Sequence, residues 1–293
     1  IFTVASIGQL VWDIYPDINH IGGTAANVAI HCRQLGDEAI LISGIGDDLS
    51  GRELIDALQE RRIITNYVQV VNGYPTGAVN ITIDSEGVPH YDCTTNVAFD
   101  HIRYSSSLKT VSNKLDAVYF DLLSQRNERT QQTMYDFLEA SQSAFILFDM
   151  DIRGWSDEID DQITKSLKFA NAMTANWDEI MQLKSAWDHD NQYNLERFIH
   201  NLLDDYGLTF ITVTHGQSGS LFFDRNNRIE TPADKSGKAK DTTGAGDAFA
   251  AAIIHQVLRE ASLPDIAVFS NKIAAYVTQF AGATPHYTLA DIA

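Results

Sequence analysis

Cysteine and long apolar runs are both scarce in this sequence. Only Cys32 and Cys93 occur among 293 residues, so a disulfide framework is excluded and the reducing cytoplasm is the expected location. No apolar run approaches the roughly 18 residues that a transmembrane helix requires, so no membrane partner is expected. The pattern Gly-x-x-x-x-Gly-Lys-Ser/Thr is missing too, which excludes a P-loop phosphate site.

Positive charge is also in short supply. The chain has 21 Lys and Arg residues against 39 Asp and Glu residues, which gives a formal net charge of -18. Such a surface repels nucleic acid, so no nucleic-acid partner is expected. It repels nucleotides as well, so a nucleotide site would have to supply N–H dipoles, cations or both. The histidines are scattered without the spacing of metal ligands.

Strand-like and helical segments alternate through most of the chain. This alternation predicts a mostly parallel sheet covered by helices on both faces, a three-layer α/β/α arrangement. Length alone would permit two domains, but an α/β fold of this size is often one, and we expect a single domain over residues 1–293. The expected strands are Phe2–Ile7, Ala39–Ile45, Ala117–Phe120, Ala144–Phe148, Phe210–Thr214 and Ser220–Phe223. The expected helices are Ala25–Leu35, Gly51–Arg62, Arg129–Ala140, Leu195–Tyr206, Ala245–Leu258 and Asp265–Phe280.

One section interrupts the alternation. Between about residues 68 and 93 three strand signals follow one another without a helix, and the last two suggest an antiparallel hairpin around Asp84-Ser85-Glu86-Gly87. Together with Gln9–Asp13 and Asn19–Gly22 this section is expected to form a small separate sheet. Trp12 is expected in the core of that sheet, and stacking on a sugar face is the alternative. The apolar face of that sheet needs cover, and the candidates are a bound substrate or a second subunit. A plain hairpin packed on the main core is the alternative.

The most informative segment reads Asp-Thr-Thr-Gly-Ala-Gly-Asp, from Asp241 to Asp247, and an apolar run follows it. It predicts a glycine-hinged turn opening onto a helix, where the N–H groups of Gly244, Ala245, Gly246 and Asp247 form an anion site. The Asp247 carboxylate would compete with a phosphate there, unless it accepts a proton from an attacking hydroxyl. An anion hole beside a base is typical of phosphoryl transfer. The alternative is an ordinary helix start, since the helix dipole favours an acid in the first turn.

A second segment, Gly22-Gly23-Thr24-Ala25-Ala26-Asn27, precedes the first expected helix. The two glycines permit close backbone approach, and Asn27 offers both a donor and an acceptor from the first helical turn. Asp13 lies just beyond the first expected strand, where a carboxylate can bind sugar hydroxyls. A capping asparagine and a surface-turn aspartate are the alternatives.

These two segments resemble those of the ribokinase-like (PfkB-type) carbohydrate kinase family. That family pairs Gly-Gly-x-x-x-Asn with Asp-x-x-Gly-Ala-Gly-Asp in this order, and the resemblance covers nearly the whole chain. Other similar stretches are Gly46-Asp47-Asp48, Thr214 to Gly219, and Asn271 with Gly282-Ala283. Within the family, the segments Gly22–Ala29 and Asn96–Asp100, with Gln125-Arg126, are most similar to bacterial fructokinases.

The resemblance implies a ribokinase-like fold with a small β-sheet lid, and a role for each matching residue. Asp247 would be the general base, within an anion hole formed by Gly244, Ala245 and Gly246. The lid would serve as a dimer clasp, so a homodimer is expected. The sugar would be held by Asp13, Gly22, Gly23 and Asn27, and the nucleotide by Asn176, Glu179, Thr214, Gly216, Gly219 and Asn271. Asp241 and Thr243 resemble the ligands of a monovalent cation, usually potassium.

The segment Asn176-Trp177-Asp178-Glu179 matches the family's Asn-x-x-Glu element, which organises magnesium partly through water. It also reads as a capping box, and the two roles can coexist. Asp149, Asp151 and Arg153 alternate at the end of an expected strand, which would place them on one face. Related kinases commonly carry Asn at the position of Asp151.

The sequence therefore predicts a sugar kinase that transfers the γ-phosphoryl group of ATP, with Mg²⁺, to a primary hydroxyl, with D-fructose as the sugar. One alternative is a kinase for another hydroxylated substrate such as ribose, a keto-sugar acid or a nucleoside. The other is a regulator that binds sugar or nucleotide without catalysis. The intact Asp247 and Gly244-Ala245-Gly246 segment favours an enzyme, because a binding protein needs no base.

Overall fold

The computed structural model describes residues 1–16, 18–83, 89–152, 155–235 and 237–292. The expected turn at Asp84-Ser85-Glu86-Gly87 and the expected position of Arg153 lie outside the described residues.

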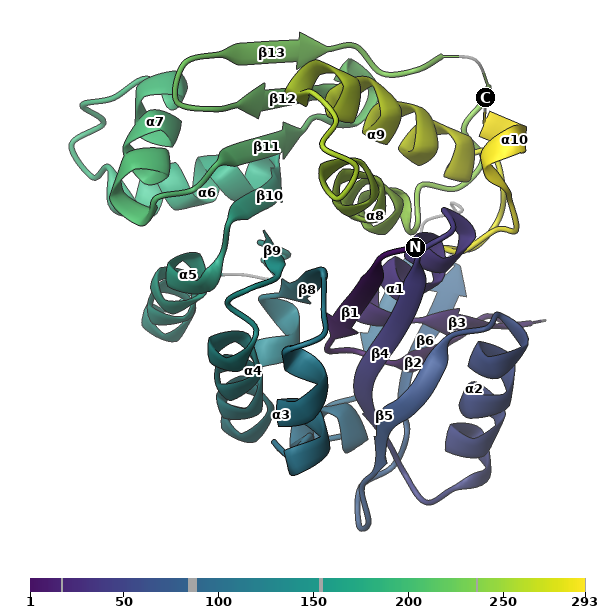
Figure 1. Cartoon of the computed structure of the whole chain (residues 1–293). Helices are drawn as coiled ribbons and strands as arrows, with labels where there is room; N and C mark the ends of the chain where they lie inside the picture. Colours follow the sequence, from purple (N-terminus) through teal and green to yellow (C-terminus); the bar gives the residue numbers. More distant parts are fainter. Residues whose placement is uncertain (17, 84–88, 153–154, 236, 293) are drawn as a thin grey trace.

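A nine-stranded sheet forms the centre of the molecule (Figure 1). Its strand order is β13-β12-β11-β10-β9-β8-β1-β4-β5, and all neighbouring pairs are parallel except those that involve β12 and β13. The strands are β1 (Thr3–Ile7), β4 (Glu38–Ile45), β5 (Ile64–Val70), β8 (Ala117–Asp121), β9 (Phe145–Asp149), β10 (Ala172–Asn176), β11 (Phe210–Thr214), β12 (Ser220–Phe223) and β13 (Arg228–Thr231). The predicted mostly parallel sheet is confirmed.

The strand order reverses at β1. From β1 the chain adds β4 and β5 on one side, and it then returns to add β8 on the other side, followed by β9, β10 and β11. In open α/β sheets the carboxyl ends of the strands on either side of such a reversal diverge and leave a crevice for ligands. The fold therefore places a binding site next to β1 and β8.

Helices cover both faces of this sheet, because side chains along each strand alternate between two buried clusters. On β8, Ala117 and Tyr119 join one cluster, whereas Val118 and Phe120 join the other. The first face is covered by α1 (Thr24–Gln34), α2 (Leu49–Glu60), α8 (Ala245–Val257) and α9 (Leu263–Val277). The second is covered by α3 (Ser106–Ser112), α4 (Glu128–Ala140), α5 (Asp157–Phe169), α6 (Trp177–Trp187) and α7 (Leu195–Tyr206).

Within the described chain, no helix is long and apolar enough to span a membrane.

Helix α8 lies deep in the molecule. Residues Ala248 to His255 are all buried, which suits a helix that is apolar on every side. It packs against both α1 and α9. The start of α8 is thereby fixed relative to the start of α1.

A second sheet of four strands lies apart from the large one, in the order β3-β2-β6-β7. It comprises β2 (Val11–Ile14), β3 (Asn19–Gly22), β6 (Gly77–Ile83) and β7 (Pro89–Cys93). The predicted boundary at about residue 68 was wrong, because β5 pairs with β4 in the large sheet and the small sheet resumes only at Gly77. The indole Nε1 of Trp12 donates to the Ser50 carbonyl, 3.0 Å away, so the ring faces α2.

Candidate active site

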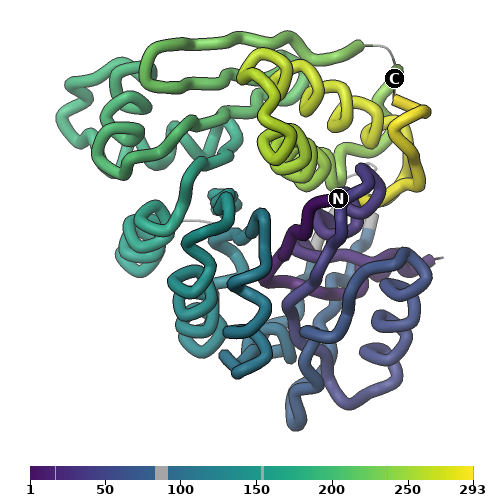
Figure 2. The backbone as a smooth tube through the Cα atoms, viewed as in Figure 1, coloured from purple at the N-terminus to yellow at the C-terminus, as the bar shows by residue number. Residues whose placement is uncertain are grey.

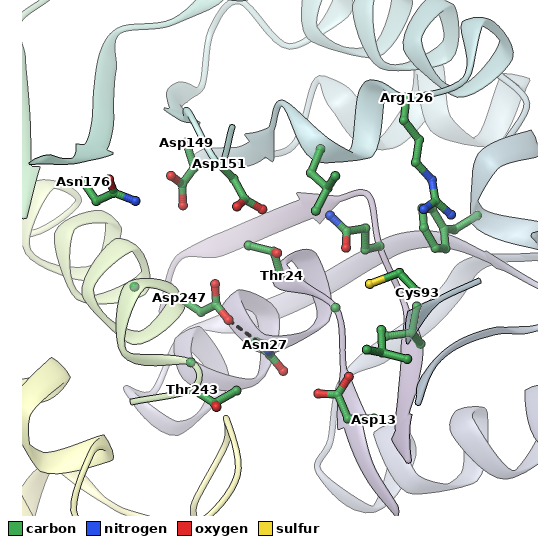
Figure 3. Close-up of a pocket in the computed structure, with 18 of the residues that line it drawn as sticks. Asp13, Thr24, Asn27, Cys93, Arg126, Asp149, Asp151, Asn176, Thr243 and Asp247 are labelled. Carbon is green, nitrogen blue, oxygen red and sulfur yellow. Dashed lines mark hydrogen bonds between the residues drawn. The ribbon is translucent and has the colours of Figure 1, made fainter. Parts of the chain in front are cut away.

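A cavity of about 900 Å³ lies between the two sheets, at the strand reversal (Figure 3). This volume is within the range typical of small-molecule sites. The small sheet contributes Val11, Asp13, Ala78, Val79 and Cys93 to its wall. The opposite wall comes from the ends of β9, β10 and β11 and from the start of α8. One cavity thus joins the two segments that the sequence singled out.

The turn before α8 is shaped by Gly244. This residue adopts a left-handed conformation with φ 76°, and a Cβ atom there would lie 2.3 Å from the Ala283 carbonyl oxygen. Glycine is required on both counts. No hydrogen bond among the described residues engages the N–H groups of Gly244, Gly246 or Asp247. The start of α8 therefore presents three unpaired donors beside the cavity, the arrangement expected of an anion site.

The fourth expected donor is committed elsewhere. The N–H of Ala245 donates to the Thr242 carbonyl, 3.2 Å away, and closes the turn. Ala245 is also absent from the described lining of the cavity, whereas Gly244, Gly246 and Asp247 are part of it. In this structure the tight turn uses the Ala245 N–H internally, so the three donors that face the cavity unpaired among the described residues are those of Gly244, Gly246 and Asp247.

Asn27 and Asp247 meet at the centre of the cavity. The amide Nδ2 of Asn27 donates to Asp247 Oδ2 over 2.8 Å (Figure 3). The Oδ1 of Asn27 is buried and has no hydrogen-bond partner within the described part of the chain. A buried acceptor without a donor is costly, so this oxygen calls for a donor from a ligand. The position of Asn27 follows from Gly23, whose φ of 95° lets α1 start against the Gln9 carbonyl.

Asp13 forms the far end of the cavity from the small sheet. Its carboxylate packs against Gly22, where any Cβ would lie 2.4 Å from the carboxylate atoms. Gly22 therefore shapes the site because its missing side chain leaves room for the Asp13 carboxylate. Gly22 itself does not appear among the described lining residues. Burial raises the pKa of Asp13 to about 6.

Asn176 and Glu179 line the cavity at the end of β10 and form a capping box at the start of α6. The Asn176 side chain accepts from the Glu179 N–H at 2.9 Å, and Glu179 accepts from the Asn176 N–H at 2.7 Å. The predicted cap is confirmed. Thr214 lines the cavity from the end of the neighbouring strand β11.

Three other expected nucleotide residues lie away from the described cavity lining. Gly216 and Gly219 flank the short 3-10 helix that connects β11 to β12. Asn271 is buried in α9, where its Nδ2 donates to Ser220 Oγ at 2.6 Å and to the Ala267 carbonyl at 2.8 Å. The bond to Ser220 ties α9 to strand β12 of the large sheet, whereas the bond to Ala267 stays within α9.

Asp241 lies behind the turn, and it links this turn to the end of the chain. Its Oδ1 accepts from the Thr243 N–H at 2.9 Å, and its Oδ2 accepts from the Gly282 N–H at 2.9 Å. Thr243 lines the cavity, whereas Asp241 does not appear in its described lining. The two residues lie together as expected, beside the segment that ends the chain.

The cavity is strongly acidic. Asp247, Asp149 and Asp151 line it, and Asp121 lies buried behind it. Burial, the largest cause, raises the pKa of Asp247 to about 7; the hydrogen bond from Asn27 opposes this rise, and the nearby carboxylates add to it. Burial likewise raises the pKa of Asp121 to about 7 and that of Asp149 well above its usual range. The Tyr119 hydroxyl donates to Asp149 Oδ2 at 2.9 Å.

The sequence correctly associated Asp149 with Asp151, but the geometric argument was wrong. Strand β9 ends at Asp149, and Asp151 has φ 20°, outside any strand conformation. Both carboxylates line the cavity opposite Asp247 (Figure 3), because the chain turns sharply after β9.

Arg126 is a cavity residue whose contacts the sequence did not reveal. Its Nε and Nη2 donate to the two carboxylate oxygens of Asp100 at 2.7 and 2.9 Å, and its guanidinium lies 4.6 Å from the centre of the Phe99 ring. Among the described lining residues it is the one basic side chain. Because Asp100 balances its charge, the net character of the cavity stays acidic.

This fold and this site define a ribokinase-like carbohydrate kinase. The chain belongs to the pfkB family of carbohydrate kinases, whose model matches residues 18–288, and it is therefore a phosphotransferase with a hydroxyl acceptor. A fructokinase of Klebsiella pneumoniae is 27% identical over 259 residues, which cover 85% of this chain and 82% of that protein. The crystal structure of an uncharacterized sugar kinase from Pyrococcus horikoshii matches 99% of this chain and 96% of its own, with a TM-score of 0.82 at 24% identity. A fructokinase from Xylella fastidiosa with bound ATP matches 99% of this chain and 96% of its own, with a TM-score of 0.86 at 18% identity.

Proposed function

We propose that this protein transfers the γ-phosphoryl group of ATP to a primary hydroxyl of D-fructose. The observation that carries the proposal is the pairing of Asp247 with the unpaired N–H groups of Gly244 and Gly246 in one cavity. The carboxylate accepts the proton of the attacking hydroxyl, while the N–H groups stabilise the charge that develops on the transferred phosphoryl group. The Oδ1 of Asn27, for which the described residues offer no donor, and the carboxylate of Asp13 accept hydrogen bonds from sugar hydroxyls.

ATP as the donor is supported by the Xylella fructokinase, whose structure holds ATP. In this chain the nucleotide lies along Asn176, Glu179 and Thr214, at the ends of β10 and β11. Gly216, Gly219 and Asn271 shape this region from behind, through the β11–β12 connection and α9.

The donor set fits magnesium held mainly by phosphates and water. Among the described residues, no group of three His, Cys, Asp or Glu side chains is placed to hold a metal ion by itself. Mg²⁺ commonly binds through one or two carboxylates, substrate phosphates and several waters. Glu179 would hold the ion through water. When bound, the ion would neutralise phosphate charge in a cavity that is itself acidic.

A monovalent cation fits beside the turn. The Asp241 carboxylate accepts from the N–H groups of Thr243 and Gly282, so it joins the turn to the segment that contains Gly282 and offers an anionic oxygen ligand there. A potassium ion there would brace the turn from the side opposite to the phosphate.

The fructose assignment is supported by the Klebsiella fructokinase and by the segments Gly22–Ala29 and Asn96–Asp100. The test is a coupled ADP-release assay with fructose, ribose, a keto-sugar acid and adenosine as acceptors. Fructose should give the highest kcat/KM. A tenfold advantage for ribose or adenosine would reject fructose and keep the kinase, whereas no ADP release with any acceptor would favour a binding regulator.

The small sheet is the proposed contact of a homodimer. Its outer strands β3 and β7 each have one unpaired edge in the described structure. Sedimentation velocity over a range of concentrations tests this proposal, and a strictly monomeric protein would reject it.

A further inference from the structure

His31 is a buried histidine that no step of the proposed reaction uses. It lies on α1, four residues after Asn27, so both side chains are on the same side of the helix. Its side chain is fully buried, and burial lowers its pKa to about 4. The imidazole is therefore neutral at physiological pH, and its two nitrogens play different hydrogen-bonding roles.

The contacts of His31 determine these roles. Its Nε2 lies 3.0 Å from the Ala283 carbonyl oxygen, and its Nδ1 lies 2.9 Å from the Tyr287 hydroxyl. A carbonyl oxygen can only accept, so Nε2 carries the proton and Nδ1 accepts from Tyr287. The two rings also stack, with centroids 5.7 Å apart. The tautomer of His31 is thus set by its two partners.

These partners belong to residues 282–287, the C-terminal segment, which Figure 2 shows in yellow beside the purple N-terminal part of the chain. Two further side chains hold this segment. Arg61 Nη1 donates to the Thr284 carbonyl at 2.9 Å, and Gln34 Oε1 accepts from the Tyr287 N–H at 3.1 Å. Among His31, Arg61 and Gln34, it is His31 that bonds to Ala283.

Ala283 is the residue against which the anion-hole turn packs. A Cβ atom added to Gly244 would lie 2.3 Å from the carbonyl oxygen of Ala283 and 2.6 Å from the Cα of Ala283. The neighbouring Gly282 N–H donates to Asp241, at the other end of the same turn. A shift of Ala283 would therefore move the N–H groups that start α8.

We infer that His31 is a positioning residue for phosphoryl transfer: as the Nε2–H tautomer, it holds the Ala283 carbonyl and thereby fixes the anion-hole turn. The inference rests on the proposed function, since it assigns the turn the role of binding the phosphoryl group. An anion hole acts most strongly on charge that develops in the transition state, so a displaced turn lowers kcat more than it raises KM for the sugar.

The test compares variants of His31 with a matched buried histidine. His31→Ala removes the bond to Ala283 and should lower kcat about tenfold or more. His31→Gln keeps an N–H donor and should recover most of the lost kcat. Tyr287→Phe keeps the ring but deletes the hydroxyl, and a smaller loss of roughly threefold is expected. In wild-type protein, ¹⁵N NMR of the imidazole should show Nε2 protonated and Nδ1 unprotonated.

His255→Ala is the control. His255 is also buried and donates to Asp37 at 2.7 Å, but it lies at the far end of α8. It should lower thermal stability and leave kcat within about twofold. The inference would be overturned if His31→Ala or Tyr287→Phe kept wild-type kcat. It would also be overturned if His255→Ala lost as much kcat as His31→Ala. Neither result would affect the proposed function. Wild-type kcat in Asp247→Asn would overturn the proposed function, and this inference with it.

Discussion

The side-chain amide of Asn27 donates a hydrogen bond to Asp247 across 2.8 Å, although 220 residues separate the two along the chain. This contact orients the carboxylate toward the cavity and partly offsets the rise in its pKa that burial causes. The oxygen of the same amide is buried and has no hydrogen-bond partner among the residues that the structure describes. Asn27 therefore links the proposed sugar-binding amide to the proposed general base.

Replacing Asp247 by Asn should preserve the fold and abolish most turnover. The amide can still accept a hydrogen bond from Asn27, but it cannot accept the proton of the attacking hydroxyl. A loss of roughly 10²–10⁴-fold in kcat is expected. Steady-state kinetics and circular dichroism test this. Asp265→Asn, in the first turn of α9, is the matched control, and it should keep wild-type kcat.

Activity should increase with pH through about 7. Asp247 must be ionised to act as a base, and burial raises its pKa to about 7, so kcat/KM should fall as the pH drops below that value. In Asn27→Ala, the loss of the hydrogen bond to the carboxylate raises this pKa further and should move the acidic limb to higher pH. The pH profile of kcat/KM is the measurement. A limb near pH 4 in wild-type protein would contradict this assignment.

Asp121→Asn should stabilise the protein at alkaline pH. Burial raises the pKa of Asp121 from 3.8 to about 7, so the native state becomes less stable as the pH rises through this interval. Each pKa unit corresponds to about 1.4 kcal/mol, so removing the charge contributes at most about 4 kcal/mol above pH 7. Lost bonds to Ser124 reduce this gain.

Urea unfolding at pH 5 and pH 8 tests this effect. The difference in unfolding free energy between Asp121→Asn and wild type should increase from the lower to the higher pH. Asp204→Asn, at an exposed carboxylate, should show the same difference at both values. A stability difference that does not change with pH would contradict the effect of burial.

Truncating Asp13 to Ala should weaken sugar binding selectively. Its carboxylate lies in the part of the cavity formed by the small sheet, away from Asn176, a residue proposed to contact the nucleotide (Figure 3). Loss of hydrogen bonds to a charged acceptor should raise KM for the sugar about tenfold or more, with KM for ATP changing less than about twofold. Asp92→Ala, at an exposed carboxylate of the same sheet, is the control. Equal changes in both KM values would argue against a sugar-binding role.

Potassium should raise the rate at a fixed magnesium concentration. A cation beside Asp241 and Thr243 would hold the turn that starts α8, because this carboxylate already joins Thr243 in the turn to Gly282 in the C-terminal segment. The comparison is between potassium chloride and tetramethylammonium chloride at equal ionic strength. Asp241→Asn should reduce the difference between the two salts. Identical rates in both salts would reject the site.

The parts of the site that could be predicted from the sequence depend on local backbone chemistry. Gly23 and Gly244 have positive φ and touch neighbouring backbone, so only glycine fits, and each marks a helix start that carries a functional side chain. Tertiary structure supplied the rest. Phe99 reaches the cavity from the short 3-10 helix Ala98–His101, and Arg126 from the residue after Leu123–Gln125, and nothing in their local sequence indicates that they meet.

Among the strands, too, local sequence predicts some elements and tertiary structure determines others. Strand β11 was predicted with its observed bounds because Phe210–Thr214 is rich in β-branched and aromatic residues. Strand β10 was missed, since Ala172-Met173-Thr174-Ala175-Asn176 contains only one β-branched residue. It is a strand because it lies between β9 and β11 and pairs with both. Strand β5 was assigned to the wrong sheet for a related reason: local propensity does not specify a pairing partner.

The packing of α1 on α8 also matters during synthesis. A ribosome that adds 5–20 residues per second needs about 10–40 s to pass from α1 to α8, given the 220-residue separation of Asn27 and Asp247. Throughout this interval the apolar side of α1 lacks its final neighbour, and the nascent chain has no complete site. Chaperones that shield this helix would therefore change how much active protein a cell obtains, without changing the rate constants of the finished enzyme.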